Sequence, residues 1–115
     1  MPAAIPSSSP FARRMKSARQ LLGISQMELG VRAGIDESSA SARINQYERG
    51  KHMPDFLTVR NLAKVLHVPA TYFYAEDDGL AALISMYGKL EPSERKALVD
   101  YAEALTNDTA TRRKK

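Results

Sequence analysis

The stretch that most restricts the fold of this chain contains two helix-capping residues with a glycine between them. Ser25 stands directly before residues 26–33, which have the composition of a short helix, and a serine here can cap its first turn. Gly34 follows, where a left-handed residue would end that helix. Asp36 can then cap a second helix over residues 37–49. The stretch is therefore predicted to form two helices joined by a tight glycine turn.

Apolar residues at helical spacing predict further helices on both sides of this pair. A helix that begins at Pro10, with Ser9 as its cap, would bury one side formed by Phe11, Met15, Ala18 and Leu22. The helix over residues 37–49 would bury Ala40, Ile44 and Tyr47. A helix capped by Asp55 would bury Phe56, Val59, Leu62, Ala63 and Leu66. Residues 69–74 suit a short fifth helix. No useful strand-like alternation occurs, so the predicted class is all-α.

The 115 residues are enough for one small domain with an appendage. Composition divides the chain into a flexible arm (1–9), the helical domain (10–75), an acidic linker (76–79), two short helices forming an αα-hairpin (80–105) and a polar, basic tail (106–115).

Charge is unevenly distributed along the chain. Residues 1–67 hold ten basic and five acidic side chains, a net charge of +5, whereas residues 68–111 hold three basic and eight acidic ones, a net charge of −5. The last four residues are all basic. Because a phosphate backbone attracts Lys and Arg, the first part of the chain is the part suited to a polyanionic partner.

The composition argues against catalysis, metal binding and membrane insertion. The chain has no cysteine, which excludes disulfides, thiolate zinc sites and a cysteine nucleophile and fits a cytoplasmic protein. Its two histidines, His52 and His67, have no carboxylate or thiol at ligand spacing. Paired acids, a glycine-rich phosphate loop and a serine nucleophile motif are absent from the sequence. No apolar run approaches the ~18 residues of a membrane span. We therefore expect no cofactor, no metal, no enzymatic activity and no membrane contact.

Taken in order, these features resemble the lambda-repressor and Cro-like (XRE-type) helix-turn-helix family. The resemblance spans residues 11–74, more than half of the chain. The matching residues, in family order and at near-family spacing, are Arg19, Ser25, Gln26, Leu29, Gly34, Ile35, Ile44, Tyr47, Glu48, Arg49, Gly50, Lys51, Pro54, Leu62, Ala63, Leu66, His67 and Val68. The resemblance implies an all-α, five-helix lambda-repressor-like DNA-binding domain, followed here by the C-terminal helical hairpin.

The resemblance also implies contacts to the DNA backbone and one structural ion pair. Gln26 would bond a phosphate with its side-chain amide, assisted by N–H groups at the start of its helix. Arg19 and Glu48 would pair across the first and third helices, which makes Glu48 a structural residue and not a catalytic acid. The basic candidates for further phosphate contacts are Arg13, Arg14, Lys16, Arg49 and Lys51.

The helix at residues 36–49 would read base edges from its polar outer side. The candidate base-contact residues are Ser38, Ser39, Ser41, Ala42, Arg43, Asn45 and Gln46. Gln and Asn can bond adenine through two hydrogen bonds, Arg can bond guanine, and the Ala methyl can touch a thymine methyl.

Two alignments with the family remain open at the start of this helix. The chain has more residues between Gly34 and Glu48 than the common family form. Counting back from Glu48 assigns the leading base contacts to Ser41 and Ala42. Counting forward from Gly34 assigns them to Ser38 and Ser39 instead.

The chain is therefore predicted to be a sequence-specific transcriptional regulator, a dimeric repressor that reads a palindromic operator in double-stranded DNA. One recognition helix covers only a few base pairs, so operators are usually read as two half-sites by a two-fold dimer. The hairpin at residues 80–105 is the candidate surface for a homodimer or a protein partner. Two alternatives stay open: the antitoxin of a toxin–antitoxin pair, and a protein–protein adaptor on the same fold. An adaptor would tolerate acidic or bulky apolar residues on the outer side of the helix at residues 36–49.

Overall fold

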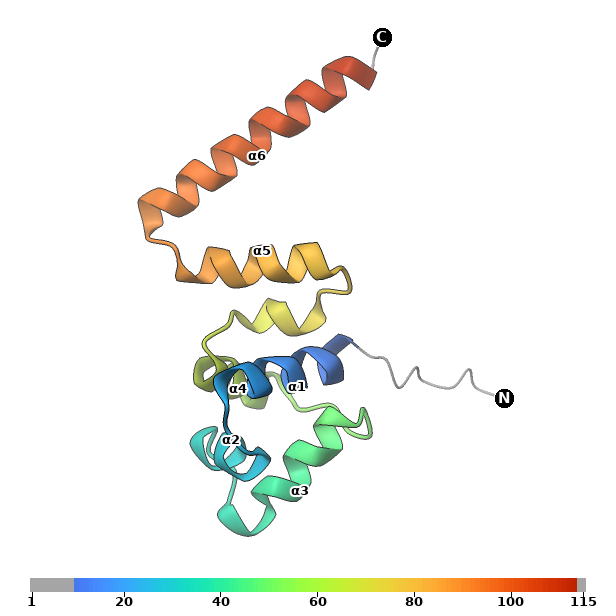
Figure 1. The fold of residues 1–115 in the computed structure, drawn as a ribbon, viewed down its shortest axis with the longest axis vertical. Helices are drawn as coiled ribbons and strands as arrows, with labels where there is room; N and C mark the ends of the chain where they lie inside the picture. The colour runs from blue at the N-terminus through green and yellow to red at the C-terminus, as the bar shows by residue number, and fades with distance from the viewer. Residues whose placement is uncertain (1–9, 114–115) are drawn as a thin grey trace, which may run out of the picture. The chain divides into compact units, whose positions relative to one another are not determined.

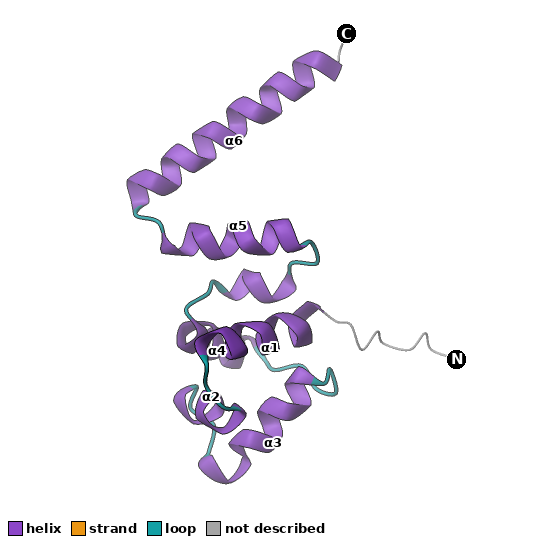
Figure 2. Ribbon diagram, viewed as in Figure 1, coloured by secondary structure: helices purple, strands orange, loops and turns teal. Residues whose placement is uncertain are grey.

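The computed structural model describes residues 10–113, and this part of the chain is helical, with no strand (Figures 1 and 2). The all-α prediction is confirmed. The elements are α1 (Pro10–Leu22), α2 (Gln26–Arg32), α3 (Glu37–Glu48), α4 (Phe56–Leu66), the 3₁₀ helix η1 (Ala70–Tyr74), α5 (Asp78–Lys89) and α6 (Pro92–Arg113). They form two compact units, one up to residue 85 and one from residue 86. The predicted arm at residues 1–9, with the Ser9 cap, lies outside the described residues.

Three helices begin at the side-chain caps that the sequence predicts. The Ser25 hydroxyl accepts the backbone N–H of residue 28 at 3.0 Å. The Asp36 carboxylate accepts the backbone N–H of residue 38 at 3.2 Å, and the Asp55 carboxylate accepts the backbone N–H of residue 58 at 2.9 Å. Each bond satisfies one of the N–H groups that the start of a helix leaves without a partner in the helix itself.

Helices α2 and α3 approach each other closely at Gly30. A Cβ atom added at Gly30 would lie 2.7 Å from the Cβ of Ala40, so only glycine fits here without a shift of α3. The turn between the helices uses Gly34, whose φ of +94° is a conformation that other residues adopt at a cost. Two glycines therefore set the geometry of the helix pair: Gly30 because it lacks a side chain, and Gly34 because it adopts a positive φ.

The core of the first unit lies among α1–α4 and η1. Its largest fully buried side chains are Phe11, Met15, Leu29, Ile44, Val59, Leu62 and Phe73. Two residues predicted to face the core are exposed instead, Leu22 by 37% and Phe56 by 72%. Both stand at helix ends, where the apolar side passes the edge of the core. The Arg60 guanidinium lies beside the Phe56 ring, with its Cζ atom 5.9 Å from the centroid of the ring.

The start of α5 is attached to α1 through Arg14, which the sequence analysis placed outside the apolar stripe. Arg14 is only 7% exposed. Its Nε donates to the carbonyl of Ala75 at 2.9 Å, its Nη2 donates to that of Glu76 at 3.1 Å, and Nη2 also lies 2.9 Å from the Asp78 carboxylate. Ala81 of α5 is buried as well.

These contacts change the predicted domain boundary. The first unit extends to residue 85 instead of ending before the acidic segment at residues 76–79. Residues 78 and 79 are already helical. The sequence prediction treated the acidic residues as a solvated linker, whereas Asp78 is bonded to α1.

The second unit contains the end of α5 and the whole of α6. The Arg95 guanidinium donates to the carbonyls of Tyr87 and Gly88 at 3.0 and 3.1 Å and lies 5.0 Å from the centre of the Tyr87 ring. It thereby satisfies carbonyl groups that the end of α5 leaves unpaired. None of the described residues of α6 is buried.

Helix α6 continues to Arg113, although a polar, frayed tail was predicted from residue 106. Its last turns contain no glycine or proline, and an ion pair of 3.2 Å joins Asp108 to Arg112 one turn later. The Thr106 hydroxyl bonds the carbonyl of Ala102 on the preceding turn at 3.2 Å. The two helices predicted for residues 80–105 are thus present, and the second is longer than expected. Residues 114 and 115 of the predicted tail lie outside the described part of the chain.

Candidate nucleic-acid interface

The outer side of α3 carries the polar residues predicted to read bases. Its inner side is buried through Ala40, Ile44 and Tyr47, as the spacing predicts. On the outer side the exposed residues are Ser38, Ser41, Ala42, Arg43 and Gln46, and the half-buried ones are Ser39 and Asn45. Helix α3 lies at the periphery of the first unit (Figure 1). All seven candidate side chains therefore belong to one helix that has a buried side and a polar side.

The first turn of α3 is acidic, a feature that the sequence analysis did not register. The hydroxyl and the backbone N–H of Ser38 both donate to the Asp36 carboxylate. These bonds, the hydroxyl bond above all, lower the pKa of Asp36. Glu37 follows as an exposed residue of the first turn. Because negative charge repels phosphates, the C-terminal half of α3, with Arg43 and Gln46, is the more favourable half for DNA.

A hydrogen-bonded network joins α1 and α3 behind this face. The Nε and Nη2 atoms of Arg19 donate to the two carboxylate oxygens of Glu48 at 2.6 and 3.0 Å. The Nη1 atom of Arg19 donates to the carbonyl of Ile24 at 3.0 Å. The Glu48 side chain is 3% exposed and that of Arg19 14%. The bonds to Glu48 raise the pKa of Arg19. The Arg19–Glu48 pair implied by the family resemblance is thus formed, and it is bidentate and largely buried.

Gln26 connects α2 to the same network. Its Nε2 donates to Oε1 of Glu48 at 3.1 Å, and its side chain stands at the first position of α2. A side-chain amide nitrogen carries two hydrogens, and the bond to Glu48 uses one of them. The bond fixes the orientation of the amide that was predicted to contact a phosphate.

The basic residues predicted to contact phosphates fall into two groups. Lys16, Arg49 and Lys51 are exposed. Arg14 is buried, and its guanidinium is bonded to carbonyls and to the Asp78 carboxylate, so the phosphate contact predicted for it is wrong. Arg13, half-exposed, also pairs with Asp78 at 3.1 Å.

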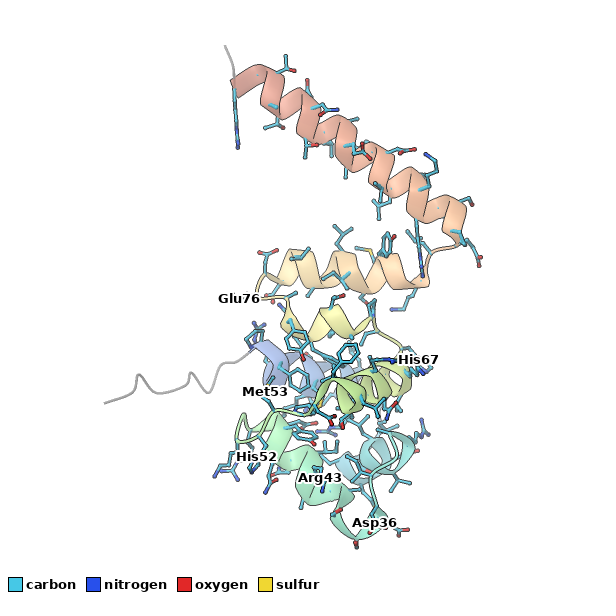
Figure 3. The ribbon with its side chains drawn as sticks, turned by 180° about the vertical axis from the view of Figure 1, so that it is seen from behind. Asp36, Arg43, His52, Met53, His67 and Glu76 are labelled. Carbon is cyan, nitrogen blue, oxygen red and sulfur yellow. The ribbon has the colours of Figure 1, made fainter. Side chains whose placement is uncertain are left out.

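A shallow, open hollow of about 270 Å³ lies between the C-terminal half of α3 and the loop that follows it. Arg43, Gln46 and Tyr47 line it from the helix, and His52 and Met53 line it from the loop. Figure 3 labels Arg43 on α3 and the two loop residues. From the sequence, His52 was weighed only as a metal ligand, and no role was predicted for Met53. The signal that could have found them is their place directly after Lys51, a predicted phosphate contact.

Residues 10–113 can be compared with the side-chain clusters that hold metal ions and with the helices that cross membranes. In this range, no group of three or more His, Asp or Glu side chains is arranged to hold a metal ion. No described helix is both long enough and apolar enough to cross a membrane.

Comparison with known proteins relates the chain to transcriptional regulators. The helix-turn-helix family model matches residues 15–73, just over half of the chain. An uncharacterised HTH-type transcriptional regulator of Sinorhizobium medicae (strain WSM419) is 30% identical over 66 residues, which are 57% of this chain and 45% of the relative. One of Rhizobium meliloti (strain 1021) matches with the same identity and the same shares. The chain spans about half the length of these curated relatives.

A solved structure extends this similarity beyond the segment that the family model covers. The crystal structure of the transcriptional regulator BswR is similar with a TM-score of 0.74 and 46% sequence identity. The match covers 81% of this chain and 92% of that chain.

Proposed function

The chain belongs to the XRE-type helix-turn-helix family of transcriptional regulators, and from this premise we propose that it is a dimeric repressor that binds a palindromic operator in double-stranded DNA. One observation carries the proposal. The outer side of the C-terminal half of α3 gathers Arg43, Asn45 and Gln46, whose side chains match the hydrogen-bonding groups of base edges. The carboxylate at the end of α3, that of Glu48, has a side chain that is 3% exposed and bound to Arg19. A protein–protein adaptor would have no reason to keep exposed carboxylates off this half of the helix.

We assign base reading first to Gln46 and Arg43 and next to Asn45 and Ala42. The serines at the start of α3 contribute at the edge of the site, because Ser38 is already used in the cap and Glu37 stands beside them. The serines assigned to this edge are Ser38, Ser39 and Ser41.

Phosphate contacts are assigned to residues on both sides of this face. Gln26 would donate its second amide hydrogen while the first stays bonded to Glu48. Lys16, Arg49 and Lys51 are exposed and would add charge-assisted contacts.

The proposed homodimer forms through the C-terminal helices. Leu80 and Leu83 of α5 are exposed by 49% and 43%, and Tyr101 and Leu105 of α6 by 65% and 51%. Helices in proteins owe most of their stability to packing of an apolar side, yet none of the described residues of α6 is buried within the single chain. A second copy that covers the apolar side chains of α6 would supply the missing packing, and a two-fold dimer would bring two recognition helices to one operator.

Selection of bound sequences from a random DNA pool tests the DNA-binding part. We expect two half-sites related by a two-fold axis and about 10 base pairs apart. Gln46→Ala and Arg43→Ala should each weaken binding by about 1–3 kcal/mol and relax the preference at one position of each half-site. Gln20→Ala, which changes an exposed glutamine of α1, should do neither. A pool from which no sequence is enriched would favour the adaptor.

Light scattering on the full chain tests the dimer, and a reporter gene tests repression. The double variant Tyr101→Ser/Leu105→Ser should lower the mass from two chains to one and weaken operator binding. A mass that stays at two chains would place the interface elsewhere. Expression of a reporter placed behind the selected operator should fall when the protein is present.

A further inference from the structure

We infer that the hollow beside α3 receives the C5-methyl group of a thymine in the operator, with Met53 as its apolar wall. The inference rests on the proposed function, since it requires α3 to face DNA. It adds the loop after α3 to the elements that read sequence.

The position of the hollow makes Met53 a neighbour of the base-reading residues. Arg43 and Gln46 form the helical side of the hollow, and the loop side is formed by His52 and Met53. Tyr47 contributes to the lining as well, although it is only 7% exposed. A base pair read by Gln46 or Arg43 would therefore bring the neighbouring base pair toward the loop.

The lining selects DNA over other partners by its charge. It contains an arginine, a glutamine and a histidine but no carboxylate, and Lys51 precedes the loop residues in the sequence. Such a surface attracts a polyanion and does not repel phosphates on either side of the contact.

The apolar part of the lining selects the group within DNA. Met53 is 58% exposed and has no hydrogen-bond donor for a phosphate. In the major groove, the thymine C5-methyl is the apolar group that a base edge presents. The thioether chain of methionine is flexible and polarizable, so it adapts to an open and irregular surface such as this hollow. The methyl group is therefore the part of the operator that Met53 fits best.

Replacement of single thymines by deoxyuridine tests the contact, because this change removes the methyl group and leaves the base pairing intact. The operator obtained by selection is synthesised with one such replacement at a time in one half-site. Burial of one methyl group corresponds to about a fourfold change in affinity. We expect one thymine whose replacement weakens binding of the original protein about fourfold. When the protein is the Met53→Ala variant, replacing that thymine by deoxyuridine should change the affinity by less than about twofold.

Leu57→Ala is the matched control, because Leu57 is an apolar residue of similar exposure, 60%, on α4 and belongs to neither proposed interface. It should keep the full deoxyuridine profile of the original protein. The inference is overturned if Met53→Ala keeps that profile too, whether its affinity is unchanged or is lowered equally for all sequences. If the original protein selects no sequence at all, the proposed function fails first, and the inference fails with it.

Discussion

Breaking the Arg19–Glu48 pair from one side should strongly destabilise the first unit. In Glu48→Ala, the Arg19 guanidinium loses its bonds of 2.6 and 3.0 Å and keeps the 3.0 Å bond to the Ile24 carbonyl. Removal of one partner of a buried pair costs about 3–5 kcal/mol, because the remaining charge is left uncompensated. Since the Arg19 side chain is 14% exposed, water reaches it, and we expect about 3 kcal/mol.

The reverse variant leaves the more deeply buried charge. In Arg19→Ala, the Glu48 carboxylate, whose side chain is 3% exposed in the original protein, loses both bonds from Arg19 and keeps the bond from the Gln26 amide. We expect a loss of about 4 kcal/mol. The double variant removes both charges together, so its loss should be about 4 kcal/mol, well below the additive value of about 7 kcal/mol.

Urea unfolding of the original protein, the two single variants and the double variant measures this cycle. An unchanged dependence of the unfolding free energy on urea would show that the variants expose similar surface. Arg32→Ala is a control, because it breaks an exposed ion pair with Glu28 and should cost less than about 1 kcal/mol. If the Arg19 and Glu48 variants cost as little as this control and simply add, the reasoning is refuted.

The coupling free energy between Arg19 and Glu48 that this cycle measures should also be independent of pH between about pH 6 and pH 10. Glu48 holds the pKa of Arg19 above its already high ordinary value. A base whose pKa is raised in the folded state contributes its stability at all pH values below the ordinary pKa. That contribution is lost only as the pH rises through the folded value, which lies far above this range.

Three further predictions concern other parts of the first unit. Gly30→Ala should lower the unfolding free energy by about 1–2 kcal/mol, because the added Cβ would lie 2.7 Å from the Cβ of Ala40 and this overpacking outweighs the gain in helix propensity. If urea unfolding shows a more stable variant, the close approach of the two helices is contradicted. Lys51→Ala should weaken binding to all DNA sequences alike and reduce the slope of log affinity against log salt by about 1, and an unchanged slope would exclude the phosphate contact. Asp78→Asn should lower the Tm above about pH 5, and by progressively less as the pH falls below the ordinary pKa of an aspartate, because hydrogen bonds from Arg14 and then Arg13 lower the pKa of Asp78. The stabilisation by the Asp78 carboxylate is present above its ordinary pKa and lost as the pH falls through the lower folded value, so a Tm difference that persists in acid would contradict this origin.

Features that depend on near neighbours in sequence were predicted correctly. The caps at Ser25 and Asp36 and the turn at Gly34 involve bonds or backbone angles within a few residues. The buried side of α3 follows from helical spacing alone. The seven candidate base contacts share one helix for the same reason, although their roles remain predictions.

Features that depend on distant parts of the chain were missed. Arg14 is buried because its guanidinium meets a carbonyl 61 residues further along the chain, and no local pattern carries that information. The hollow beside α3 was missed because the loop forms its second side only after the chain has turned back toward the helix. Helix α6 was predicted too short, because its polar last turns lack the apolar spacing that marks a helix in sequence.

The two attachments of α3 bear on how this protein can meet an operator. At one end of the helix Gly30 touches Ala40, and at the other end Glu48 is bonded to α1 and α2. These contacts hold α3 at one angle to its neighbouring helices, so we expect it to tilt little by itself in an irregular groove. If α3 reads an operator as proposed, the duplex would have to adapt to the helix, so base steps that the protein never touches should influence affinity through their stiffness. New specificities should arise from exchanges of outer side chains, with the angle of the helix in the groove left as it is.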